Sequence, residues 1–265
     1  MQVEKKDNQI TINGMKLSYT ETNGSKPAII LLHGWTCNRT FWNKQLELFT
    51  DRRKAVSIDF RGHGESQITS EGNTIQQLAD DVYAFIEKME FEKVVLIGHS
   101  MGGMVAQLLC SEHIECLEAL ILVTTIAADL KDKLISKQIE SDTPIYGYRN
   151  AFLKNYIGWL NPEADSKIVE WTKDQMLKTP ESVANSLVRS YRTFDLRSCL
   201  PKIKIPCLVV GAGSDASAVP EEAKTLASLI PEAQLVMIDN CGHFPMLEQP
   251  ERLNQELNRF LSFLS

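Results

Sequence analysis

Short apolar runs alternate with amphipathic stretches along most of the chain, which is the pattern of a parallel sheet covered by helices. An N-terminal hairpin is predicted from residues 9–12 and 16–20, which flank the turn dipeptide Asn13-Gly14. Further strands are expected at 28–32, 55–59, 94–97, 119–123, 205–210 and 234–238. Several of these runs are apolar at every position, which is typical of strands buried on both faces. Helices are predicted between them at 41–49, 75–89, 101–110 and 219–230, and at the end at 251–264.

One long stretch interrupts this alternation. Between Val123 and Ile205 no run predicts a strand, and helices are expected instead at 130–140, 148–160, 164–178 and 181–192. The simplest interpretation of such an insertion is a helical lid over the end of the sheet. The sequence therefore predicts an α/β core from residues 1–125 and 201–265, with about eight mostly parallel strands and helices on both faces. Residues 126–200 are predicted to form a helical cap.

Composition and charge narrow the possible partners. The 265 residues are 43% hydrophobic and 23% charged, which is ordinary for a globular protein. The 28 basic and 34 acidic residues give a net charge of −6, so the basic excess that nucleic-acid binding requires is missing. The first segment of the chain is polar, and no apolar run is long enough to span a membrane. Together these observations predict a cytoplasmic protein without a membrane partner. The six cysteines lack zinc-ligand spacing, so we expect reduced thiols and no metal.

The first candidate for chemistry is the pentapeptide Gly98-His99-Ser100-Met101-Gly102. It follows an apolar strand and precedes a helix, which is the context of a nucleophile elbow. In an elbow a strained turn exposes the serine, and the glycines allow helix and strand to approach closely. The helix N-terminus then offers N–H groups to an oxyanion. A simpler alternative is that Ser100 only caps the helix.

A serine hydroxyl needs a base before it becomes a useful nucleophile. His243 lies directly after the last predicted strand, at the same edge of the sheet as Ser100, and is therefore the candidate base. His99 is expected to pack away from the site. Asp215 follows the strand at 205–210 and is the candidate acid that orients the histidine. Asp129, shortly after an earlier strand, remains the alternative acid.

With these motifs the chain resembles the α/β-hydrolase fold family. The likeness extends from about residue 16 to the C-terminus, outside the insertion. The residues that carry it are His33-Gly34-Trp35, Asp59 to Ser66, the serine motif, Asp215 and Gly242-His243. In this family the acid follows the serine and precedes the histidine along the chain, and Asp215 lies in that position. One departure is an extra residue between Gly211 and Asp215, where the family commonly reads G-x-x-D.

The resemblance implies a serine hydrolase that cleaves a small-molecule carboxylic ester or lactone through an acyl-enzyme. The backbone N–H groups of Trp35 and Met101 would form the oxyanion hole, and no metal or organic cofactor is needed. Trp35 and Phe244 flank the expected site and predict an apolar substrate pocket. One alternative is a C–C bond hydrolase acting on vinylogous diketones, although such enzymes often carry tryptophan where Phe244 stands. Another is a ligand receptor or signalling protein on the same fold.

Overall fold

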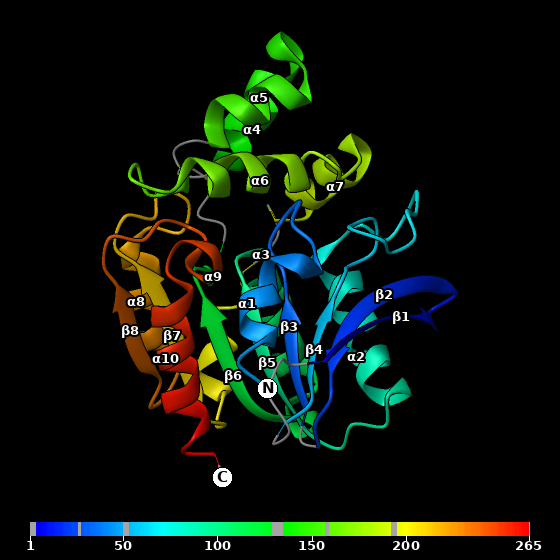
Figure 1. Cartoon of the computed structure of the whole chain (residues 1–265), viewed down its shortest axis with the longest axis vertical. Helices are drawn as coiled ribbons and strands as arrows, with labels where there is room; N and C mark the ends of the chain where they lie inside the picture. The colour runs from blue at the N-terminus through cyan, green and yellow to red at the C-terminus, as the bar shows by residue number, and fades with distance from the viewer. Residues whose placement is uncertain are drawn as a thin grey trace.

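A computed structural model describes residues 4–25, 28–49, 53–128, 135–156, 159–191 and 195–264. Its strands are β1 (Lys5–Ile12), β2 (Met15–Thr22), β3 (Ala28–Leu32), β4 (Ala55–Ile58), β5 (Val94–His99), β6 (Leu117–Val123), β7 (Cys207–Ala212) and β8 (Gln234–Ile238). They form one sheet in the order β1-β2-β4-β3-β5-β6-β7-β8 (Figure 1). Strand β2 pairs antiparallel with both of its neighbours, and all the other pairs are parallel. The predicted mostly parallel sheet of eight strands is confirmed.

The burial of the strands follows their sequence pattern. Every residue of β3, β4 and β5 is buried, and the uninterrupted apolar run of β3 is typical of a strand covered on both faces. At the N-terminal hairpin, Asn13 and Gly14 have φ values of 50° and 75°, the left-handed backbone that a two-residue turn of this type requires. The turn sets the register, in which Ile12 lies opposite Met15.

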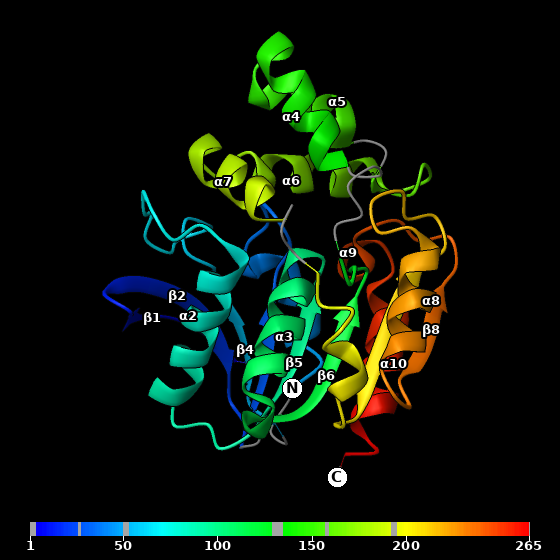
Figure 2. The same cartoon turned by 180° about the vertical axis from the view of Figure 1, so that it is seen from behind.

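Helices cover both faces of the sheet. Helices α2 (Ile75–Lys88), α3 (Met101–Glu112) and α8 (Pro220–Leu229) lie on the face turned toward the viewer in Figure 2. Helices α1 (Asn43–Leu46) and α10 (Pro250–Leu261) lie on the opposite face, and the short α9 (Pro245–Glu248) precedes α10. Among the described residues, no helix is long and apolar enough to cross a membrane.

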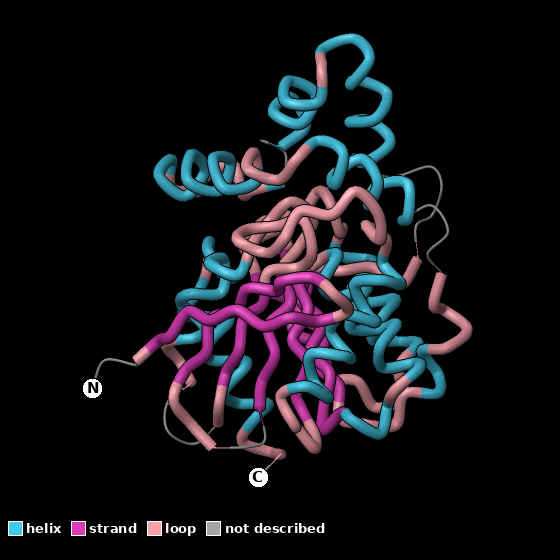
Figure 3. Tube along the Cα trace, turned by 90° about the vertical axis from the view of Figure 1, so that its right-hand side faces the viewer, coloured by secondary structure: helices cyan, strands magenta, loops and turns pink. Residues whose placement is uncertain are grey.

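Among the described residues, four α-helices come between β6 and β7: α4 (Ile135–Tyr146), α5 (Tyr148–Tyr156), α6 (Ser166–Met176) and α7 (Glu181–Tyr191). We call the described part of residues 135–191 the helical insertion. Figures 1 and 3 show it beyond the carboxyl ends of the parallel strands, with loops between it and the sheet. The division into a core of 1–125 and 201–265 and a cap of 126–200 remains a prediction.

Several predicted helices differ from the observed ones; the helix expected at 148–160, for example, is observed as α5, which ends at Tyr156. The single helix expected at 41–49 is wrong, because a 3₁₀ turn at Arg39–Trp42 precedes a four-residue α1. The Asn38 side chain accepts the Thr40 N–H and starts this turn two residues before the apolar pattern begins. The helix expected at 130–140 lies partly outside the described ranges, and in the described part α4 continues to Tyr146. Pro144 lies inside α4 and supplies no backbone N–H to that helix.

Candidate active site

Ser100 occupies a sharp turn between β5 and α3. Its backbone angles, φ 51° and ψ −117°, lie in a region that non-glycine residues rarely adopt. The flanking glycines explain how the turn is accommodated: a Cβ on Gly98 would overlap the carbonyl oxygen of Gly102, and a Cβ on Gly102 would overlap that of Leu32 in β3. The Ser100 side chain caps no N–H of α3, so the alternative interpretation of a helix cap is wrong.

Ser100, His243 and Asp215 form one chain of hydrogen bonds. The Oγ of Ser100 lies 2.9 Å from Nε2 of His243, and Nδ1 of His243 lies 2.8 Å from Oδ2 of Asp215. The other carboxylate oxygen of Asp215 accepts the N–H groups of Ser217 at 2.7 Å and Ala218 at 3.0 Å. Because a carboxylate only accepts, Nδ1 of His243 carries the hydrogen and Nε2 presents a lone pair to the serine hydroxyl.

The extra residue before Asp215 does not keep this side chain from the site. Strand β7 continues two residues beyond its predicted end at 210, and Gly211 and Ala212 still pair with β8. Asp215 follows three residues later and is buried against His243. The longer strand thus delivers this side chain to the edge of the sheet that carries Ser100. The alternative acid, Asp129, lies outside the described residues.

The two residues predicted to donate backbone N–H groups, Trp35 and Met101, line the same pocket as Ser100. Met101 is the first residue of α3, where an N–H has no acceptor within the helix. Trp35 lies in the loop after β3, and its indole N–H donates to the carbonyl of Ala184 in α7 at 3.1 Å. In the part of the chain that the structure describes, the backbone N–H of neither Trp35 nor Met101 has a hydrogen-bond acceptor.

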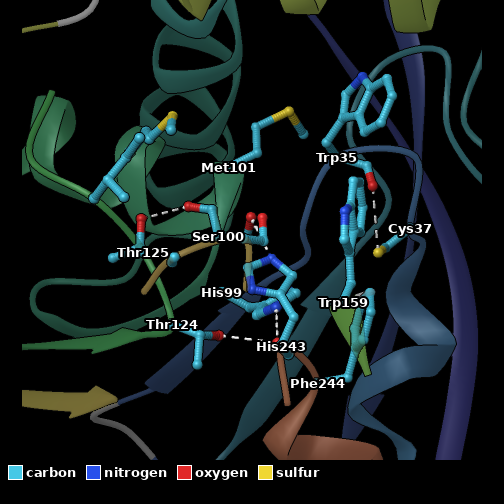
Figure 4. Close-up of a pocket in the computed structure, with 14 residues that line it drawn as sticks. Trp35, Cys37, His99, Ser100, Met101, Thr124, Thr125, Trp159, His243 and Phe244 are labelled. Atoms are coloured by element: carbon cyan, nitrogen blue, oxygen red, sulfur yellow. Dashed lines mark hydrogen bonds between the residues drawn. The ribbon is translucent and has the colours of Figure 1, made fainter. Parts of the chain in front are cut away.

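A largely apolar pocket opens in front of Ser100 (Figure 4). Both residues predicted to line it, Trp35 and Phe244, do so, and Trp159 of the helical insertion joins them. The remaining lining residues are Cys37, His99, Ser100, Met101, Met104, Thr124, Thr125, Ile126, Ser217, Ala218 and His243. Burial raises the pKa of the Cys37 thiol well above its usual value, so this cysteine is protonated and a poor nucleophile.

His99 and Thr124 contact the site in a way that the sequence did not predict. His99 is buried as expected, but it does not pack away: its Nε2–H donates to the carbonyl of His243 at 2.8 Å, and it lines the pocket. The Thr124 hydroxyl donates to the same carbonyl at 3.0 Å. Burial, together with the neighbouring His243, holds the pKa of His99 well below its usual value. His99 is therefore a neutral donor that helps to hold the His243 backbone.

Asp59 and Arg61, which belong to the other motif, contact residues outside the pocket. The carboxylate of Asp59 accepts the Arg39 N–H at 2.6 Å and pairs with the Arg39 guanidinium, and Arg61 pairs with Asp81 in α2. These contacts fold the loop after β4. Among the described residues, no cluster of three side chains suitable for holding a metal ion is found.

The sequence matches the alpha/beta hydrolase family over residues 29–256. The chain belongs to this family. An AB hydrolase superfamily protein, YisY of Bacillus subtilis (strain 168), is 27% identical over 259 residues, which cover 91% of this chain and 94% of the relative. The 3-oxoadipate enol-lactonase 2 of Acinetobacter baylyi is 25% identical over 256 residues, 92% of each chain. The solved structure of a thermophilic esterase from Thermogutta terrifontis, with malate bound, has a TM-score of 0.87 at 28% identity and covers 98% of this hydrolase and 99% of the esterase.

Proposed function

We propose that this hydrolase cleaves a small-molecule carboxylic ester or lactone through an acyl-enzyme formed on Ser100. The observation that carries the proposal is the hydrogen-bond chain from Ser100 through His243 to Asp215. Such a chain supplies a nucleophile, a base in the correct tautomer and a group that stabilises the imidazolium. The similarity to an esterase and to an enol-lactonase supports both substrate classes.

In the first half of the reaction, Ser100 Oγ attacks the carbonyl carbon while Nε2 of His243 takes the hydroxyl proton. The negative charge on the carbonyl oxygen is received by the N–H groups of Trp35 and Met101, which have no competing acceptor among the described residues. Collapse of the tetrahedral intermediate expels the alcohol oxygen, and His243 returns the proton to it. For a lactone this oxygen stays attached to the acyl group.

In the second half, His243 removes a proton from water, and the resulting hydroxide attacks the acyl-enzyme. The same N–H groups stabilise the second oxyanion, and Ser100 leaves with the proton from His243. The apolar lining of the pocket, with Trp35, Trp159 and Phe244, favours an acyl group of low polarity.

The helical insertion acts as a lid in this proposal. It contributes Trp159 to the pocket wall, and its helix α7 accepts the indole N–H of Trp35. A lid in this position excludes water from the acyl-enzyme and selects the substrate by shape.

The serine assignment is tested with a fluorophosphonate probe and with p-nitrophenyl butyrate and γ-butyrolactone as substrates. We expect the probe to label one residue of the wild-type protein, and Ser100→Ala to lose labelling and about 10⁴- to 10⁶-fold in kcat. Ser111→Ala, an exposed serine at the end of α3, is the matched control and should behave as wild type. Undiminished hydrolysis by Ser100→Ala would exclude the serine mechanism.

A further inference from the structure

The carboxylate of Glu248, the last residue of α9, faces the loop that carries His243. Its Oε2 accepts the backbone N–H of Gly242 at 2.9 Å and that of Asn161 at 2.8 Å. Its Oε1 accepts the N–H of Phe244 at 2.9 Å. One carboxylate therefore binds both neighbours of His243 and one residue of the helical insertion.

A second contact joins the same two segments. The backbone N–H of His243 donates to the carbonyl of Trp159 at 2.6 Å. Gly242 lies so close to the insertion that a Cβ there would overlap the backbone of Leu160 and Asn161. Residues 242–244 and 159–161 are thus held together through their backbones, with no space for a side chain between them.

Helix capping explains only part of this arrangement. Phe244 precedes the first residue of α9, so its bond to Glu248 satisfies an N–H that the helix leaves open. The bonds to Gly242 and Asn161 lie outside the helix. Within the described ranges, no lysine or arginine pairs with Glu248, so backbone N–H groups are the partners of its charge. Hydrogen bonds to an ionised acceptor are stronger than neutral ones, which favours a rigid loop.

We propose that Glu248 is a positioning residue, a clamp that holds the histidine loop against residues 159–161 of the helical insertion. While this contact is made, His243 stays aligned with Ser100 and Asp215. The inference rests on the proposed function of His243 as the base. Its ring must stay within hydrogen-bond distance of both Ser100 and Asp215, and the clamp fixes the backbone on either side of that ring. The insertion then acts on the reaction rate through His243, in addition to shaping the pocket.

Glu248→Gln tests the clamp with little change in size. A glutamine keeps one acceptor oxygen, and its amide NH₂ group faces backbone N–H donors where a carboxylate oxygen accepted them. We expect kcat to fall on the order of 10- to 100-fold, because small displacements of a catalytic group have effects of this size. KM should change little, because Glu248 does not line the pocket. Glu251→Gln, an exposed glutamate in the first turn of α10, is the control and should keep wild-type kcat.

Proton NMR gives a readout that does not depend on a substrate. The Nδ1–H of His243, shared with Asp215, should resonate far downfield in the wild type and in Ser100→Ala. Glu248→Gln should shift or broaden this resonance, and Glu251→Gln should not. If the wild type hydrolyses no ester or lactone, the proposed function fails, whereas the resonance still reports whether Glu248 positions His243.

Gly242→Ala breaks the same contact from the other side and leaves Glu248 in place. Its Cβ would force residues 159–161 away, so we expect the same fall in kcat and the same change in the resonance. Gly213→Ala is the matched control, since its Cβ would come no closer than 3.5 Å to a neighbouring atom. Circular dichroism checks the fold of each variant, and Gly242→Ala decides the question if Glu248→Gln does not fold. Wild-type kcat together with an unchanged resonance in a folded Glu248→Gln or Gly242→Ala would overturn the proposal.

Discussion

The serine side and the histidine side of the candidate site are held in different ways. Ser100 is held by the sheet itself: its turn joins β5 directly to α3, and its carbonyl accepts the N–H groups of Gly103 and Met104 in that helix. His243 is held by residues distant in the chain, among them Trp159 of the helical insertion and His99 of β5. A nucleophile can thus be built from one short motif, whereas the position of its base depends on tertiary packing.

On the histidine side, the largest fall in kcat is expected from a change of Asp215, the buried carboxylate that contacts His243. Asp215→Asn keeps the shape of the side chain but favours the wrong tautomer of His243, so kcat should fall by about 10⁴-fold. The measurement is the steady-state hydrolysis of p-nitrophenyl butyrate by Asp215→Asn and, beside it, Asp129→Asn. If Asp215→Asn kept more than about a tenth of wild-type kcat, where a lost acid costs thousands-fold, and Asp129→Asn lost its activity, Asp129 would be the acid.

The serine side was predictable because its determinants are local. The apolar run of β5, the serine and the glycines at 98 and 102 lie within nine consecutive residues. Their chemistry already specifies a buried strand, a strained turn and close helix packing. Parallel strands also have their carboxyl ends at one edge, so the positions of Asp215 and His243 after strands implied that they meet Ser100. The extra residue before Asp215 did not prevent this, because Asp215 Oδ2 still lies 2.8 Å from Nδ1 of His243.

The supports of the histidine side could not be predicted in the same way. Asn161 and Glu248 are 87 residues apart in sequence, and His99 and His243 are 144 apart. Glu248 also gave no local signal, since an acidic residue in the first turn of a short helix is ordinary. Likewise, the pattern of the helical insertion indicated helices but not that Trp159, between two of them, would contact His243. Periodicity predicts which face of an element is buried, and only the tertiary structure shows what the backbone between elements contacts.

A matched pair of threonines tests the comparison directly. The Thr124 hydroxyl donates to the His243 carbonyl, and the Thr125 hydroxyl donates to the Ser100 carbonyl at 2.6 Å. We expect Thr124→Val to lower kcat by roughly fivefold, because the lost hydrogen bond, worth about 1 kcal/mol, no longer holds the backbone of the base. Thr125→Val should cost less than about threefold, because the Ser100 carbonyl keeps two N–H donors of α3. Equal losses of kcat in the two variants, measured in parallel, would show that the two sides are held alike.

The last expected effect concerns stability and involves two further buried histidines, His33 and His63. Burial, and for His63 also the neighbouring His33, lowers the pKa of His33 and His63 to about 3. In the unfolded chain a histidine titrates near pH 6.5, so below that pH the unfolded state binds more protons and the free energy of unfolding falls. Between about pH 7.5 and about pH 5.5 the loss should be about 1.4 kcal/mol for each of the two histidines.

Urea unfolding at the two pH values measures this loss in the free energy of unfolding. His63→Asn should reduce the pH dependence by about one histidine's share. A free energy of unfolding that is equal at both pH values in the wild type would mean that these histidines take up protons without unfolding.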